Sequence, residues 1–212
     1  GEEITSQYVD YQTRMTQNLF ATAGLRFDEH SKAGNEDSHR VSLVYLFDNK
    51  LTKLKTSYGT SFRFPSLYEL YTVYGSKVYN NKAETGKSFD IGIEKSFVES
   101  GIKFDLTYFS HKYYDTLDGW KDGASDGNSY YHNQSGIVKS KGLEFISKWK
   151  KNDFLNFDLN YTYTSTYDGA DEDDLRDGYT SSGAFLDKRM VRVPRHLVNL
   201  KTNFLVPGKK LG

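Results

Sequence analysis

The sequence has no cysteine, no excess of either charge and no long apolar run, and each absence excludes a class of protein. Without cysteine, the chain can have neither a disulfide scaffold nor thiolate chemistry. Its 28 basic and 28 acidic side chains give a formal net charge of zero, which removes the electrostatic argument for nucleic-acid binding. No stretch of about 18 apolar residues occurs, so a membrane-spanning helix is excluded.

The composition instead favours a sheet with one apolar and one polar face. Mean hydropathy is low, at −0.69, yet aromatic residues make up 16% of the chain, with 17 Tyr and 14 Phe. Soluble domains of this size usually carry more Leu, Ile and Val for a core. Many aromatic residues together with many small polar residues are typical of sheets that meet lipid on one side and water on the other.

Apolar and polar side chains alternate with a period of two along much of the chain. In one segment Leu155, Phe157 and Leu159 alternate with Asn156 and Asp158. Successive side chains of a strand point to opposite faces, so each such segment has an apolar and a hydrophilic face. The pattern predicts about nine strands, near residues 5–16, 19–30, 39–48, 51–62, 87–98, 101–118, 130–149, 154–167 and 195–206.

The connections between these strands are predicted to alternate strictly between short and long. The short ones lie near residues 16–18, 48–50, 98–101, 150–153 and 207–210, and the long ones near 30–38, 62–87, 118–130 and 167–195. Outer-membrane barrels have short periplasmic turns and long extracellular loops, and strands of at least 9–11 residues cross the hydrocarbon. The sequence therefore predicts an all-β fold, a meandering antiparallel segment of a transmembrane β-barrel.

Aromatic residues near the strand ends mark where the two aromatic girdles of such a barrel would lie. They are Phe47, Phe97, Tyr113, Tyr114 and Trp149. Each is also an ordinary strand residue. A soluble β-sandwich binding module stays an alternative, and it would require two sheets that share an inner core.

The number of predicted strands suggests an incomplete barrel. Nine is odd, whereas single-chain bacterial barrels have even numbers of strands. The segment from Pro207 to Gly212 resembles a turn into a further strand, and no start signal or signal peptide opens the chain at Gly1. We expect residues 1–212 to be an internal fragment of one barrel domain, whose open sheet edges would let copies associate.

Four motifs resemble those of the barrels of TonB-dependent receptors. The segment 58–71 is similar to that family's Phe-Arg-x-Pro-Ser/Thr-Leu-x-Glu-Leu motif, and 84–94 resembles its Pro-Glu-x-Ser strand entry, with Ala83 in place of the proline. The segment 131–144 is similar to its Asn-x-Gly-x-Ala-x-x-x-Gly-(Val/Leu)-Glu motif, and 192–196 to its Arg-x-Pro-x-His entry. The matching residues singled out are Phe62, Arg63, Pro65, Ser66, Asn133, Gly142, Glu144, Arg192, Pro194 and His196.

The resemblance covers essentially the whole chain and implies the later part of a 22-stranded barrel in a bacterial outer membrane. It implies a receptor that binds a scarce nutrient outside the cell and takes it up with energy from the TonB complex. The plug domain, which contacts TonB in this family, is not in the sequence, so the chain would supply wall and loops. The partners implied are TonB through that plug, an extracellular small molecule and outer-membrane lipid.

Most motif residues have a structural reading as well as a ligand-binding one. Gly142 within a strand indicates a close backbone approach. Pro65 cannot donate to a sheet ladder, so its strand must end near Phe62. We expect Arg63 and Glu144 to face the lumen, where they would meet plug residues or water.

Ligand contacts in this family come from the long loops, where this chain places many aromatic residues. Flat, rigid rings suit a bulky ligand, although the same rings could pack the loops against one another. The candidate ligand-binding residues are Tyr68, Tyr71, Tyr74, Trp120, Tyr130 and Tyr131.

The sequence narrows the ligand without identifying it. Haem receptors that share the Phe-Arg-x-Pro motif carry an Asn-Pro-Asn-Leu box and a histidine between the two, and the segment 63–88 has neither. Cobalamin or a ferric siderophore is therefore expected, with slightly closer similarity to the cobalamin type. No cofactor and no metal site is assigned. The acidic run 168–174 could hold Ca²⁺ but lacks EF-hand spacing, and solvation is the simpler reading.

An outer-membrane hydrolase is a further alternative. His30, His111 and His132 approach the external rim beside Asp and Ser residues, as such an enzyme would require. None of the histidines lies in a recognisable nucleophile motif, and no Gly-x-Ser-x-Gly elbow occurs. We therefore assign no catalytic residue.

Overall fold

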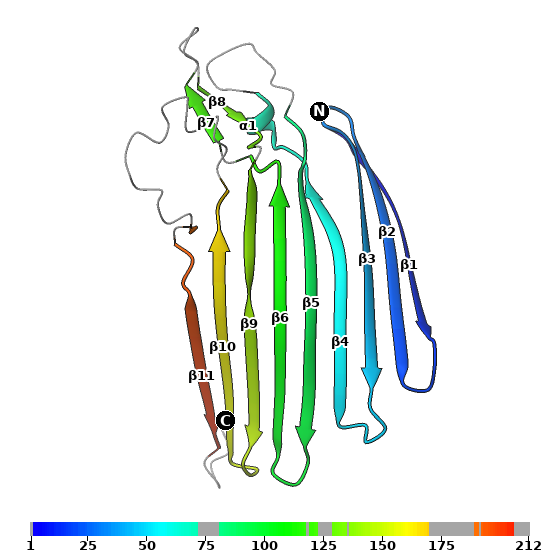
Figure 1. The fold of residues 1–212 in the computed structure, drawn as a ribbon, viewed down its shortest axis with the longest axis vertical. Helices are drawn as coiled ribbons and strands as arrows, with labels where there is room; N and C mark the ends of the chain where they lie inside the picture. Colours follow the sequence, from blue (N-terminus) through cyan, green and yellow to red (C-terminus); the bar gives the residue numbers. More distant parts are fainter. Residues whose placement is uncertain are drawn as a thin grey trace, which may run out of the picture.

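In the computed structural model nine strands form one antiparallel sheet, in the order β1-β2-β3-β4-β5-β6-β9-β10-β11 (Figure 1). The structure describes residues 2–71, 81–117, 119–122, 129–134, 136–169, 189–190 and 192–205, of which 119–122, 129 and 130 are described by their backbone alone. The strands are β1 Ile4–Arg14, β2 Leu19–His30, β3 Gly34–Leu46, β4 Thr52–Arg63, β5 Glu84–Phe97, β6 Ile102–Tyr114, β9 Ile137–Lys150, β10 Leu155–Tyr167 and β11 His196–Phe204. The predicted meander of nine antiparallel strands is confirmed.

The two ends of the sheet differ in what joins the strands. Tight turns join β1 to β2, β3 to β4, β5 to β6 and β9 to β10 at one end, which we call the turn end (Figure 1). The other end, the loop end, carries helix α1, Leu67–Leu70, and a hairpin of β7, Gly119–Asp122, with β8, Ser129–His132. None of the helices in the described ranges is long and apolar enough to cross a membrane.

One predicted long connection is wrong. The loop expected at 30–38 is a turn of three residues, because β2 continues to His30 and β3 already begins at Gly34. Residues 34–38 are mostly polar on both faces, so they show no apolar alternation although they pair with β2. Short and long connections therefore do not alternate strictly along the chain.

The predicted elements also differ near the loop end. The strand expected at 101–118 ends at Tyr114, and the strand expected at 130–149 is divided, since β8 ends at His132 and β9 begins at Ile137. Of the five expected girdle residues, Tyr113 is misplaced. It lies opposite Gly86 and Val138 on the polar face, because its neighbour Tyr114 occupies the apolar one.

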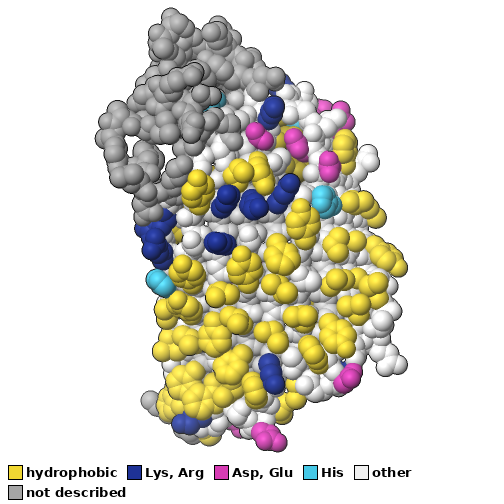
Figure 2. Space-filling view, viewed as in Figure 1, with side chains coloured by type: hydrophobic (Ala, Val, Ile, Leu, Met, Phe, Trp, Pro, Cys, Tyr) yellow, Lys and Arg dark blue, Asp and Glu magenta, His cyan; other side chains and the backbone are white. Residues whose placement is uncertain are grey.

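One face of the sheet is apolar and exposed along its whole breadth. Across its middle, Leu54, Ile93, Leu106 and Phe145 lie opposite one another in consecutive strands. Figure 2 views this face, where hydrophobic side chains cover most of the sheet. Towards the turn end aromatic rings meet in pairs, among them Trp149 with Phe157 at 5.4 Å. The apolar face has the composition expected of a surface in contact with lipid.

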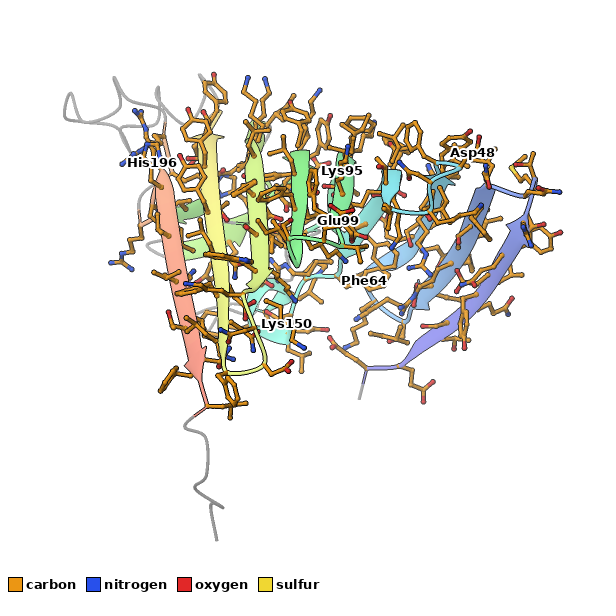
Figure 3. All side chains as sticks on the ribbon, turned by 90° about the horizontal axis from the view of Figure 1, so that it is seen from below. Asp48, Phe64, Lys95, Glu99, Lys150 and His196 are labelled. Atoms are coloured by element: carbon orange, nitrogen blue, oxygen red, sulfur yellow. The ribbon has the colours of Figure 1, made fainter. Side chains whose placement is uncertain are left out.

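The opposite face is polar and cross-linked by ion pairs. Glu94 accepts hydrogen bonds from Lys53 at 2.9 Å and from Lys103 at 2.8 Å, one on each neighbouring strand. Lys55 reaches across β5 to Asp105 on β6, with 2.5 Å between Nζ and Oδ2. Seen along the strands, side chains project from both faces of one layer (Figure 3). Within the described residues no second sheet covers either face, so the β-sandwich alternative is wrong.

Buried apolar side chains are few and lie mainly at the loop end. Leu70 in α1, Ala83 just before β5 and Leu117 two residues before β7 are at most 5% exposed. On the polar face Phe109 is buried over Gly142. A small core thus supports the loop end, whereas the sheet itself has no core.

The face assignment predicts that the same substitution costs far more stability at one position of β9 than at the adjacent one. Leu143 lies on the apolar face and Glu144 on the polar face. In the full-length protein folded into bilayers, Leu143→Arg should lower the free energy of unfolding by about 2–4 kcal/mol, since a charge enters hydrocarbon. Glu144→Arg should change it by less than about 1 kcal/mol. Chemical unfolding in lipid vesicles measures both, and equal costs would contradict the assignment.

Candidate functional site

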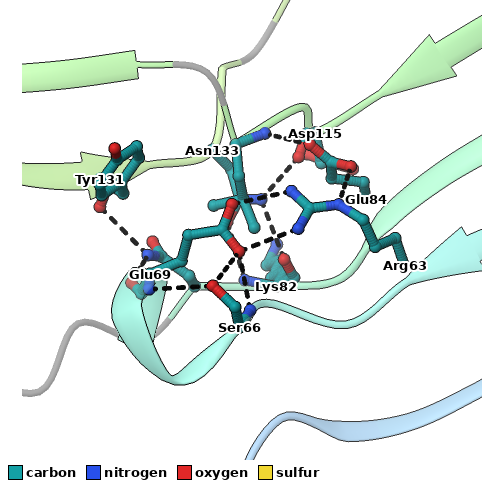
Figure 4. A network of polar contacts seen from close by, with 10 residues as sticks. Arg63, Ser66, Glu69, Lys82, Glu84, Asp115, Tyr131 and Asn133 are labelled. Atoms are coloured by element: carbon teal, nitrogen blue, oxygen red, sulfur yellow. Dashed lines mark hydrogen bonds and ion pairs between the residues drawn. The ribbon is translucent and has the colours of Figure 1, made fainter. Parts of the chain in front are cut away.

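Three loop-end segments meet at the guanidinium of Arg63, the last residue of β4. Its Nη1 and Nη2 donate to both carboxylate oxygens of Glu69 in α1, each at 2.9 Å. Its Nε donates to Oε2 of Glu84, the first residue of β5, at 2.6 Å (Figure 4). A planar guanidinium matches two carboxylates in this fork geometry, which a lysine cannot reproduce. We call this the Arg63 node.

The local sequence explains why α1 forms beside the node. Pro65 ends the ladder of β4, and Ser66 starts the helix as its N-cap. The pair Ser66 and Glu69 forms a capping box, in which the Glu69 carboxylate also accepts hydrogen bonds from the backbone N of Ser66 at 2.7 Å and its Oγ at 2.8 Å. Glu69 therefore caps the helix and binds Arg63 with the same carboxylate.

Two asparagines join the segment around β8 to the same node. Asn133 accepts from the backbone N of Lys82 at 2.8 Å and donates to the carbonyl oxygens of Lys82 and Asp115 at 3.0 and 2.6 Å. Asn81, 8% exposed, donates to the carbonyl oxygens of Glu69 and Tyr131. Glu84 completes the connection by accepting from the backbone N of Leu117 at 2.6 Å. Segments 50 residues apart are thus held together by side-chain-to-backbone hydrogen bonds.

The charge state of Glu69 keeps this arrangement in place. Partial burial alone raises the pKa of its carboxyl, but hydrogen bonds from Arg63 and from the backbone and hydroxyl of Ser66 outweigh that effect. The net result lowers the pKa of Glu69 from 4.5 to about 2. The node is therefore fully charged at neutral pH.

Three of the six candidate ligand-binding residues have described side chains, and they lie around the node. Tyr68 and Tyr131 pack edge to face with 5.6 Å between ring centroids, and Tyr68 remains 51% exposed. The hydroxyl of Tyr71 accepts from Nζ of Lys32 in the β2–β3 turn at 2.5 Å. Tyr74 lies outside the described residues. The side chains of Trp120 and Tyr130 do as well, although their backbones pair in β7 and β8.

The other motif residues lie away from the node. Phe62 faces outward with its ring 5.2 Å from Phe64. A Cβ at Gly142 would lie 2.7 Å from the Phe109 ring, so only glycine fits there. Glu144, like Arg63, lies on the polar face, opposite residues of β6 and β10.

The fourth motif is also separate from the node. Pro194 precedes β11, and Arg192 has a positive φ of 62°. Nδ1 of His196 lies 2.9 Å from the Tyr161 hydroxyl on β10. Its described contacts are thus with the neighbouring strand.

Sequence reasoning missed Asn81 and Lys32, which both contact the node region. Neither lies in a motif, and their roles depend on contacts with segments distant in sequence. Among the described residues no group of three His, Asp or Glu side chains could hold a metal ion. Of the acidic run at 168–174, Asp168 and Gly169 are described and the remainder lies outside the described ranges.

Comparisons with known proteins agree on one family. A family model described as TonB dependent receptor-like, beta-barrel matches residues 1–211. The vitamin B12 transporter BtuB of Vibrio cholerae is 30% identical over 134 residues, which cover 63% of this chain and 20% of that protein. The ferric enterobactin receptor of Pseudomonas aeruginosa is 27% identical over 187 residues, covering 76% and 25%.

Solved structures show the same fold. A variant of the ferric enterobactin receptor PfeA from Pseudomonas aeruginosa, in complex with enterobactin, superposes with a TM-score of 0.74 at 23% identity, covering 96% of this chain and 30% of that one. The siderophore receptor PirA from Acinetobacter baumannii gives 0.74 at 18% identity, covering 98% and 32%. The chain thus spans about a fifth to a third of the length of these relatives.

The Arg63 node predicts a local stability effect. Arg63→Ala leaves two partly buried carboxylates without their cation and should destabilise α1 and the start of β5 by about 1–2 kcal/mol. The cost stays below that of a fully buried pair because the Arg63 side chain is 48% exposed. Hydrogen exchange of residues 66–71 and 81–85 measures it. Arg40→Ala, which removes a more exposed pair with Asp10, is the matched control and should change little.

The lowered pKa of Glu69 predicts acid sensitivity at the same place. A carboxyl with a folded pKa of about 2 and an ordinary value of 4.5 contributes stability that is complete above about pH 4.5. That stability is lost as the pH falls towards 2. Hydrogen exchange of α1, normalised for the intrinsic pH effect, should rise over this range in the wild type. In the Glu69→Gln variant, hydrogen exchange of α1 should be faster than in the wild type at pH 7 and nearly independent of pH. An unchanged wild-type profile would contradict the node.

Proposed function

This chain belongs to the TonB-dependent receptor β-barrel family, and we propose that it forms wall and loops of a receptor that takes up a metal chelate, cobalamin or a ferric siderophore, with energy from TonB. The family consists of outer-membrane receptors and transporters rather than enzymes. Uptake would need the whole protein, including the plug that contacts TonB, so the role of this chain is to present the external site and enclose the path inward.

The convergence of three loop-end segments on the Arg63 node carries the proposal. Binding sites built on loops need a rigid base, because every degree of freedom lost on binding lowers the affinity. The node, the capping box and the two asparagines fix the backbone of α1, 81–84 and 131–134 relative to one another. They leave the ring of Tyr68 half exposed at the loop end.

The chemistry of that surface suits a bulky chelate. Cobalamin and ferric siderophores are large, rigid and rich in flat rings or amides, and aromatic side chains contact such groups at low entropic cost. The relatives include a transporter named for vitamin B12 and receptors named for ferric enterobactin, so the comparisons support both ligand classes equally.

The hydrolase alternative has little support in the described geometry. Nδ1 of His30 accepts hydrogen bonds from the backbone of Lys32 and Ala33 and so closes a turn. His111 lies 3.0 Å from the Ser88 hydroxyl, but in the part of the chain that the structure describes no carboxylate hydrogen-bonds its ring. A nucleophile and base without the orienting third group is an incomplete catalytic arrangement.

Binding and uptake of both chelate classes by the full-length receptor test the proposal. We expect saturable binding of either cobalamin or a ferric catecholate siderophore, and uptake that stops when TonB is deleted. Tyr68→Ala should weaken binding about two- to tenfold, as loss of one aromatic contact predicts. Tyr163→Ala, on the apolar face, is the control and should bind normally. Binding of neither class, or TonB-independent uptake, would contradict the proposal.

A further inference from the structure

Four lysines on the apolar face form a cluster below the loop end. Lys87 on β5 lies directly opposite Lys112 on β6, and Lys112 lies directly opposite Lys139 on β9. Lys141 follows two residues along β9 on the same face. All four side chains are exposed. We call them the lysine patch, which appears in Figure 2 as a dark-blue group between the hydrophobic surface and the loop end.

The patch has no anionic partner within the described residues. On the polar face Lys53, Lys55 and Lys103 each form an ion pair with a carboxylate. In the described part of the chain, the patch lysines form no such pair. Like charges directly opposite each other in an antiparallel sheet are destabilising. A row of three on adjacent strands therefore calls for a counter-charge, which the described residues do not supply.

The height of the patch on the sheet identifies where that counter-charge lies. Lys139 is ten residues before Trp149, which belongs to the aromatic pairs near the turn end. At about 3.3 Å per residue and a strand tilt of about 40°, this separation is roughly 25 Å along the membrane normal, the height of the apolar band of such barrels. The patch thus lies at the upper edge of the hydrocarbon, at the level of lipid headgroups.

The immediate surroundings of the patch are those of a membrane interface. Nζ of Lys87 lies 5.4 Å from the centre of the Tyr114 ring, and Nζ of Lys139 lies 5.2 Å from that of Tyr167. Tyrosine is enriched at this depth because its ring prefers the apolar side and its hydroxyl the wet side. Ser110 lies opposite Lys141 and adds a hydroxyl donor on the same face.

We propose that the lysine patch binds the phosphate groups of an anionic lipid in the leaflet at the loop end of the outer membrane. Ammonium groups offer three donors each and bind phosphate as point charges. Bound phosphates would neutralise the repulsion along the row while the acyl chains cover the apolar surface below it. The inference rests on the outer-membrane location of the family and does not depend on which nutrient is taken up.

Lipid retention by the full-length receptor tests the patch. The probe is diphosphorylated lipid A in mixed micelles, and native mass spectrometry measures the bound lipid. The variant carries Lys87→Gln, Lys112→Gln, Lys139→Gln and Lys141→Gln. Because each interfacial lysine contributes on the order of 1 kcal/mol towards anionic lipid, its apparent affinity for lipid A should fall at least tenfold. A matched control with Lys50→Gln, Lys95→Gln, Lys150→Gln and Lys151→Gln removes the same charge at the turn end and should retain the lipid.

Further experiments distinguish the possible sources of the anion and test whether the patch variant is correctly folded. Lipid A without phosphates should bind weakly to wild type, and inorganic phosphate should compete poorly at equal concentration. Equal binding of the dephosphorylated lipid, effective competition by free phosphate, or unchanged affinity in the patch variant would overturn the proposal. Heat-modifiable migration and chelate binding of the patch variant should match wild type. If the fourfold variant does not fold, Lys112→Gln alone should still lower lipid A affinity severalfold.

Discussion

The strict alternation of side chains across one sheet is the constraint on which the rest of this structure depends. With no second layer over either face in the described residues, each strand residue meets lipid or the polar interior according to its register alone. The ion pairs between Lys53, Glu94 and Lys103 stabilise the polar face, where charges can be hydrated or paired. The apolar face instead gains its stability from the membrane that surrounds it.

The loop end is held together by different interactions, because there the chain extends beyond both the hydrogen-bonded sheet and the lipid. Side chains replace the sheet ladder in joining distant segments: Arg63 binds two carboxylates, and Asn133 pairs with the backbone of Lys82 much as a neighbouring strand would. These contacts give the external loops a fixed base. The boundary between the lipid-covered sheet and the loop end also explains the position of the lysine patch. Charges are tolerated on the apolar face only where the hydrocarbon ends.

Most of the fold could be predicted from the sequence, since period-two alternation specifies strands and faces directly. Alternation is a poor guide where strands continue beyond the lipid: residues 34–38 of β3 are polar on both sides, and the pattern of residues 130–149 predicts one strand where the structure has two, β8 and β9. Tyr113 is aromatic and near a strand end, as girdle residues are, yet it lies on the polar face, because register and not aromatic type decides the face. The motifs located Arg63, Ser66 and Asn133, but their convergence, and the part played by Asn81, depend on contacts between residues far apart in sequence.

Site-directed labelling along β9 tests the central claim that register alone assigns each residue to its environment. Within these 212 residues no native cysteine competes with single cysteines placed at 143–147 of the full-length protein. Ile146 lies on the polar face opposite Asp105 and Asn160, and Ser147 lies on the apolar face between Phe104 and Leu159. Each of the two therefore lies on the face that its own polarity would not favour. With the protein in bilayers, a lipid-borne quencher should reach probes at 143, 145 and 147, and a water-soluble quencher those at 144 and 146. Quenching that follows the hydrophobicity of the replaced residue, or shows no alternation, would contradict this account.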